Sequence, residues 1–173
     1  MKKRAVLVAS LLLVCLAGTM VAHPHFNKSV TAAVKGLELK LSYFTLPYNA
    51  KHLEGIKEGF VFHCGRAKLN VAGEITVGST KLGAGTYLLR AKAKSAHEWT
   101  LVLIPEAQAG DPQNPDITKG TALETKSFTK QSELHHLDLN LTGGHGDTDG
   151  KLLVSVAFGS RRIEAVITLP AAA

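Results

Sequence analysis

Apolar and polar residues alternate along much of the chain, most clearly between residues 85 and 105. One face carries Tyr87, Leu89, Ala91 and Ala93 on the first arm and Trp99, Leu101 and Leu103 on the second. The other face of the first arm carries Arg90, Lys92 and Lys94. Residues 83–85 (Gly-Ala-Gly) make a corner before the first arm, residues 95–97 turn the chain, and Pro105 ends the second arm. This period-two pattern predicts a long antiparallel hairpin that is half buried.

Shorter segments with the same alternation precede and follow this hairpin. We predict strands at 30–34, 37–43, 60–64, 123–129, 137–141, 152–158 and 163–169, with turns at 143–150 and 159–161. Residues 69–71 and 75–77 form either a hairpin or two short strands, and residues 106–121 form a long surface loop. No segment of ten residues has a helical period. The pattern therefore predicts an antiparallel β-sandwich of eight or nine short strands, with a β-barrel as the second choice.

The first 22 residues have the pattern of a secretory signal peptide. Three basic residues precede an apolar run from residue 5 to residue 16, and small residues follow up to Ala22. We expect cleavage after Ala22, which leaves one domain at residues 23–173 in the periplasm or outside the cell. The alternative is an uncleaved membrane anchor, because residues 5–22 are about long enough to span a bilayer. After cleavage, the chain is not expected to be an integral membrane protein.

Charge and cysteine content narrow the possible partners. Removal of Lys2, Lys3 and Arg4 lowers the formal net charge from +6 to +3, and no block of like charge remains. This gives no case for nucleic-acid binding. Cleavage also removes Cys15, so Cys64 is left without an internal disulfide partner. Its expected state is a buried, inert thiol, although metal ligation and an intermolecular disulfide are alternatives.

Residues 37–105 resemble a family of secreted bacterial proteins known as domain of unknown function 2911. The resemblance lies in L-S-Y-F-T-L-P at 41–47, in residues 62–67, and above all in K-L-G-A-G-T-Y at 81–87 followed by E-W-T-L-V-L-I-P at 98–105. It implies export and an all-β fold, and it implies no particular activity. Residues 62–67 (F-H-C-G-R-A) depart from the family pattern, which has a tryptophan–arginine pair and a glycine–alanine–asparagine run there. The polar side chains that the family pattern places there are missing from this chain.

His23 and His25 are the candidate metal ligands. Cleavage after Ala22 would give His23 a free α-amino group beside its imidazole, and a second imidazole would complete a T-shaped site suited to Cu(II). His25 would lie on the same face of an extended segment. Pro24 has no N–H, which excludes binding through successive deprotonated backbone amides. The pair resembles the N-terminal histidine copper sites of some exported β-sandwich proteins, including polysaccharide mono-oxygenases. The alternative is a terminal tail whose histidines bind nothing.

The other reactive residues suggest structural roles. His63 and Cys64 are neighbours, so in a strand they project to opposite faces, with Cys64 inside and His63 exposed. We expect His135 at the edge of the core, hydrogen-bonded, and His136 with Asp138 on the outer face. Residues 143–150 lack the late glutamate of a calcium loop and are predicted to form a turn.

Enzyme signatures are absent from the sequence: it has no G-x-S-x-G, no phosphate-binding glycine loop, no C-x-x-C and no H-E-x-x-H. We therefore expect a non-catalytic binding or envelope-associated module whose partner is an unknown small ligand or envelope component. The alternative function is a copper-binding protein, either a carrier or an oxidase, that uses His23 and His25.

Overall fold

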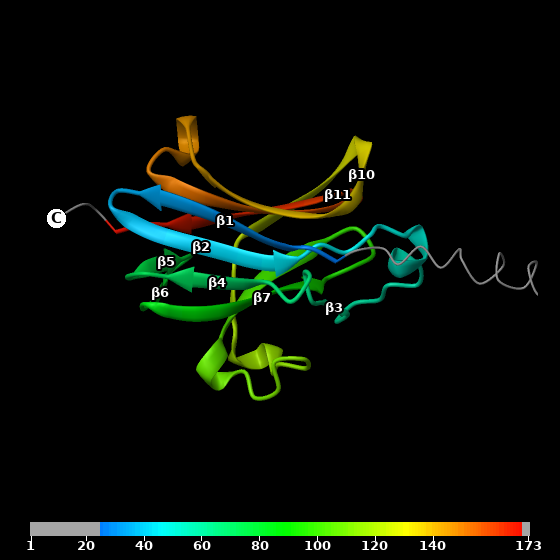
Figure 1. The fold of residues 1–173 in the computed structure, drawn as a ribbon, viewed down its shortest axis with the longest axis horizontal. Helices are drawn as coiled ribbons and strands as arrows, with labels where there is room; N and C mark the ends of the chain where they lie inside the picture. The colour runs from blue at the N-terminus through cyan, green and yellow to red at the C-terminus, as the bar shows by residue number, and fades with distance from the viewer. Residues whose placement is uncertain (1–24, 171–173) are drawn as a thin grey trace, which may run out of the picture.

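Two antiparallel β-sheets face each other in the computed structural model, which describes residues 25–170 (Figure 1). The seven-stranded sheet has the order β1 (Asn27–Val34), β2 (Leu37–Phe44), β4 (Lys68–Val71), β7 (Gly85–Ala93), β8 (Trp99–Pro105) and β9 (Thr121–Ala122), and β3 (Val61–Phe62) also pairs with β7. The four-stranded sheet has the order β10 (Thr125–Gly143), β11 (Lys151–Thr168), β5 (Ile75–Val77) and β6 (Thr80–Leu82). The predicted all-β sandwich is confirmed, and the described residues form no closed barrel.

The β7–β8 hairpin forms as the alternation predicts. Leu89 pairs with Leu103 and Ala91 with Leu101, and all four side chains are fully buried in the core between the sheets. Full burial of each leucine contributes about 1.5–3 kcal/mol to stability. At the corner before β7, the Tyr87 hydroxyl donates to the carbonyl oxygen of Gly83 at 2.7 Å, which fixes the entry of the strand.

The outward face of this hairpin is also covered, so the prediction of a half-buried pair is wrong at its centre. Leu88, Val102 and Ile104 form a second small core with Ala109, and Ile117 packs against it. The covering segment runs from residue 106 to residue 120 and contains two 3-10 turns, η3 (Glu106–Gln108) and η4 (Ile117–Lys119). It lies on the side of the seven-stranded sheet away from β10 and β11 (Figure 1). Arg90, on this face, is only 1% exposed.

β10 and β11 are single long strands, so the predicted turn at 159–161 is wrong. Gly159 takes a positive φ of 59°, and the register shifts on both sides of the Leu134–Gly159 pair. A bulge of this kind bends a strand without ending it. The predicted turn at 143–150 does form, and it contains η5 (Gly146–Thr148). Residues 25–170 contain eleven strands, whereas eight or nine were predicted. Four of the eleven, β3, β5, β6 and β9, are only two or three residues long.

Residues 69–71 and 75–77 are two short strands and not a hairpin. They lie in β4 and β5, which belong to different sheets. After β2 the chain passes from the seven-stranded sheet to β10 of the other sheet. There Tyr48 N–H donates to His135 O at 2.7 Å and Leu137 N–H donates to Leu46 O at 2.8 Å. The chain after β2 is thereby fastened to β10, and η2 (Ala50–Leu53) follows it. Within residues 25–170, no helix has the length and apolarity needed to cross a membrane.

Candidate functional site

The chain between β3 and β4 makes a left-handed turn at residues 64–66. Cys64, Gly65 and Arg66 have φ values of 49°, 63° and 57°. Such a conformation costs about 1–2 kcal/mol for each residue that is not glycine. The turn is held by two backbone bonds: Arg66 N–H donates to His63 O at 2.9 Å, and Phe44 N–H of β2 donates to Gly65 O at 2.8 Å. Because the backbone is not extended here, the side chains do not alternate as they would along a strand.

The turn places the Cys64 thiol inside the core. The side chain is 0% exposed, and its sulfur donates to the carbonyl oxygen of Phe62 at 3.6 Å. Burial raises the pKa of the Cys64 thiol to about 12, and the nearby Arg90 cation only partly opposes this. The prediction of a buried thiol is confirmed. A thiol in this state carries almost no thiolate at neutral pH and is a poor nucleophile.

Thr45, directly after β2, fixes the first described residues. Its N–H donates to Phe26 O at 2.8 Å, its hydroxyl oxygen accepts from Phe26 N–H at 2.9 Å, and its carbonyl oxygen lies 3.0 Å from His25 Nδ1. A carbonyl can only accept, so this contact requires the proton to be on Nδ1. In neutral His25, Nε2 therefore carries the free lone pair.

The left-handed turn and the end of β2 enclose a cavity of about 360 Å³. Its lining residues are His25, Phe44, Leu46, His63, Gly65 and Arg66. At Gly65 a Cβ atom would overlap the Phe44 carbonyl oxygen and would lie 2.9 Å from Leu137 Cδ2. Glycine therefore lets the turn approach β2 closely, and residues of both segments line the cavity.

Positive charge dominates the surroundings of the cavity. Among residues 25–170, no aspartate or glutamate lines it, and Arg66 has no carboxylate within 4.0 Å. Desolvation, together with the charges of Arg90 and Arg66, lowers the pKa of His63 below its usual value. His63 is therefore neutral at pH 7, while the two guanidinium groups remain charged.

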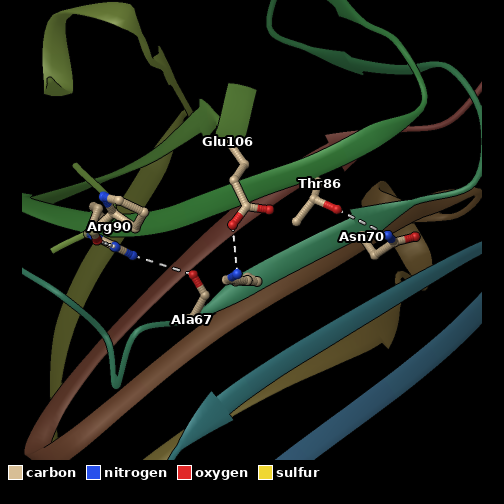
Figure 2. A network of polar contacts seen from close by, with 7 residues as sticks. Ala67, Asn70, Thr86, Arg90 and Glu106 are labelled. Atoms are coloured by element: carbon tan, nitrogen blue, oxygen red, sulfur yellow. Dashed lines mark hydrogen bonds and ion pairs between the residues drawn. The ribbon is translucent and has the colours of Figure 1, made fainter. Parts of the chain in front are cut away.

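Arg90 is held by backbone oxygens instead of a carboxylate. Its guanidinium donates to Leu89 O and Pro112 O at 2.9 Å each and to Ala67 O at 3.4 Å (Figure 2). Glu106 of η3 is already paired with Lys68, with 2.6 Å between Oε1 and Nζ, and Figure 2 draws a dashed contact from the Glu106 carboxylate. The buried positive charge of Arg90 is therefore not neutralised by an ion pair with any residue in 25–170.

A second cavity, of about 330 Å³, lies at the other end of β7. It is lined by residues 84–87 and 105–107. Its titratable lining groups are Glu106, which is already paired with Lys68, and Tyr87, whose hydroxyl is bonded to Gly83 O. The cavity at the left-handed turn has more unpaired polar groups and is the stronger candidate.

Of the two predicted metal ligands, only His25 belongs to the described residues. His23 lies outside the described residues, so the pairing of His23 with His25 stays a prediction. His25 lies at the cavity, where it shares the lining with His63. The described residues contain no group of three or more His, Cys, Asp or Glu side chains arranged to hold a metal ion.

The remaining histidines do not converge on this cavity. His135 is exposed, so its predicted place at the edge of the core is wrong. The reason is a register shift in β10 between Leu134 and Asp138, which breaks the alternation with Leu137 and Leu139. His136 is exposed as predicted. Asp138 accepts a hydrogen bond from the Tyr43 hydroxyl at 3.1 Å.

Sequence reasoning missed Phe44, Leu46 and Arg66 as lining residues. The one available signal was Gly65, since a glycine between polar residues indicates a turn more often than a strand. A turn at this point brings residues 63 and 66 to the same side, whereas a strand would separate them.

Comparison with known proteins yields no match to a family model, to a curated protein or to a solved structure. The resemblance of residues 37–105 to domain of unknown function 2911 therefore stays an expectation.

Proposed function

We propose that this chain is a non-catalytic binding module that takes a small ligand into the cavity at the left-handed turn. The supporting observation is the cavity of about 360 Å³, which has apolar walls and three polar side chains converging on it. Ligand pockets in proteins typically combine this size range with mostly apolar walls and a few polar groups. The volume lies near the lower end of that range, so the space suits a small ligand.

The character of the lining favours binding over catalysis. Among residues 25–170, no serine, cysteine, lysine or carboxylate lines the cavity, and its titratable side chains are His25, His63 and Arg66. General acid–base catalysis by histidine commonly needs a neighbouring group that orients the ring and stabilises its charged form. His25 is oriented by a neutral carbonyl, and His63 is surrounded by positive charge that disfavours its protonation. The proposed function therefore involves no bond-making step.

The experiment is an amide NMR titration of the protein, expressed with its own N-terminal segment and processed by the host. The probes are benzoate, benzamide and benzylamine, which share a ring and differ in charge. We expect at least one probe to shift the amide signals of residues 63–66. Phe44→Ser removes an apolar wall and should weaken binding. Phe128→Ser is the matched control, because Phe128 is 37% exposed and Phe44 is 38% exposed. Absence of shifts at residues 63–66 with all three probes would contradict the proposal.

Copper binding is the second candidate function, and one contact favours it. The bond from His25 Nδ1 to Thr45 O leaves Nε2 free to bind a metal, and hydrogen bonding of the opposite nitrogen is the usual arrangement for a metal-ligating histidine. In this proposal His23 supplies its amino group and imidazole, and His25 supplies Nε2. Cu(II) titration of the mature protein tests it. Unchanged copper affinity in His25→Ala, or a mature chain that begins at another residue, would exclude it.

A further inference from the structure

The charge around the cavity points to the class of ligand. Arg66 is exposed at the rim, and no carboxylate in residues 25–170 pairs with it. Arg90 lies behind the rim, held by three backbone oxygens. Two nearby positive charges that share no acidic partner produce a positive potential, which attracts anions.

The polar groups also have the chemistry that a carboxylate requires. A guanidinium presents paired N–H donors that match the two oxygens of a carboxylate. The His25 imidazole also lines the cavity, where the bond from Nδ1 to Thr45 O fixes the ring. Phe44 and Leu46 supply the apolar part of the lining. The arrangement fits a ligand with one charged end and one apolar body.

We infer that the ligand of this cavity is a small organic monocarboxylate, whose carboxylate binds Arg66 and whose apolar part packs against Phe44 and Leu46. This inference rests on the proposed function, because it names the ligand class of the same cavity. It adds a requirement for negative charge that a general binding module does not have.

The test compares probes of equal size in the same NMR titration. Benzoate should bind at least tenfold more tightly than benzamide, and benzylamine should not bind measurably. In Arg66→Asn the affinity for benzoate should fall at least tenfold, while the affinity for benzamide should change less than twofold. Asparagine is used because it tolerates a positive φ. Arg66→Lys serves as the second variant and should retain part of the benzoate affinity. Lys40→Ala is the charge-matched control, since Lys40 is exposed on β2 and does not line the cavity.

The possible outcomes distinguish a failure of the carboxylate assignment from a failure of the proposed binding function. Equal affinity for benzoate and benzamide at residues 63–66 would overturn the carboxylate assignment and leave the binding module intact. Tighter binding of phenyl phosphate than of benzoate would also overturn it, in favour of a phosphate ligand. An equal loss of benzoate affinity in Lys40→Ala and Arg66→Asn would show attraction by overall charge only and overturn the role of Arg66. If none of the probes binds at these residues, both the ligand class and the module are wrong.

Discussion

Replacement of Gly65 by alanine tests the left-handed turn on which the cavity depends. Gly65 has a φ of 63°, and an added Cβ would overlap the Phe44 carbonyl oxygen and lie 2.9 Å from Leu137 Cδ2. The alanine costs about 1–2 kcal/mol for its backbone conformation. Relief of the overlap also weakens the bond from Phe44 N–H to Gly65 O, which contributes about 1 kcal/mol, and displaces packed atoms at about 1–3 kcal/mol. The expected total loss in free energy of unfolding is about 3–6 kcal/mol.

Gly36→Ala is the matched control for this prediction. Gly36 also has a positive φ, of 77°, but a Cβ there would have no atom within 4 Å. It should therefore cost only the backbone term of about 1–2 kcal/mol. Urea unfolding followed by tryptophan fluorescence gives both values, because Trp99 is the single tryptophan and is buried. Equal destabilisation by the two substitutions would refute the close approach of the turn to β2.

Three further predictions concern buried or partly buried groups. Cys64 should lower the free energy of unfolding by about 1.4 kcal/mol for each pH unit above pH 9, because the unfolded chain releases the Cys64 proton that the folded chain retains up to a pKa of about 12. Cys64→Ala should remove this contribution and leave that of Tyr43 and Tyr87, whose pKa values burial also raises; equal slopes in the two proteins would contradict it. His63 has a lowered pKa, so the unfolded chain takes up its proton first as the pH falls below about 6.5 and stability is lost there. The urea midpoint of the natural protein should therefore fall relative to that of His63→Gln from pH 7 to pH 5, and a constant difference would contradict this. Arg90→Met should lower the free energy of unfolding by about 1–3 kcal/mol. It should also speed amide hydrogen exchange in residues 106–120, because Pro112 O loses its donor. Unchanged exchange would show that this bond does not hold the segment.

Local alternation was sufficient to predict the β7–β8 hairpin, because each side of a strand packs against a different layer. It did not predict that Leu88 and Arg90 are buried, since their cover comes from residues 106–120, which carry few apolar residues and have no regular period. The same limit applies to Gly159. A glycine in a β-rich sequence marks a turn or a bulge equally well, and only the long-range pairing of β10 with β11 decides between them.

The candidate site was predictable only in part, because it depends on a backbone conformation that sequence patterns rarely reveal. His25 could be identified as a possible ligand, but its partner Thr45 O is a backbone atom and leaves no signal in the sequence. For His63 and Cys64, strand alternation predicted the buried thiol correctly although the chain forms a left-handed turn there. His63 was expected to be exposed but is half-buried at the cavity, because the turn brings it close to β2.

The carboxylate and the copper proposals both place a ligand at the cavity that His25 and Arg66 line, and the positive charge of Arg66 should affect the two ligands in opposite directions. A positive charge at the rim attracts a carboxylate and repels Cu(II), since like charges in one partly desolvated site disfavour each other. Removal of that charge in Arg66→Asn should therefore weaken benzoate binding and strengthen Cu(II) binding, when each is measured by isothermal titration calorimetry at the same ionic strength. Lys40→Ala changes the net charge equally and should leave both affinities within about twofold, because a charge farther than about 10 Å from an exposed site is largely screened at 0.1 M salt. A loss of both affinities in Arg66→Asn would mean that the substitution disturbs the turn itself, and the electrostatic argument for either ligand would then be wrong.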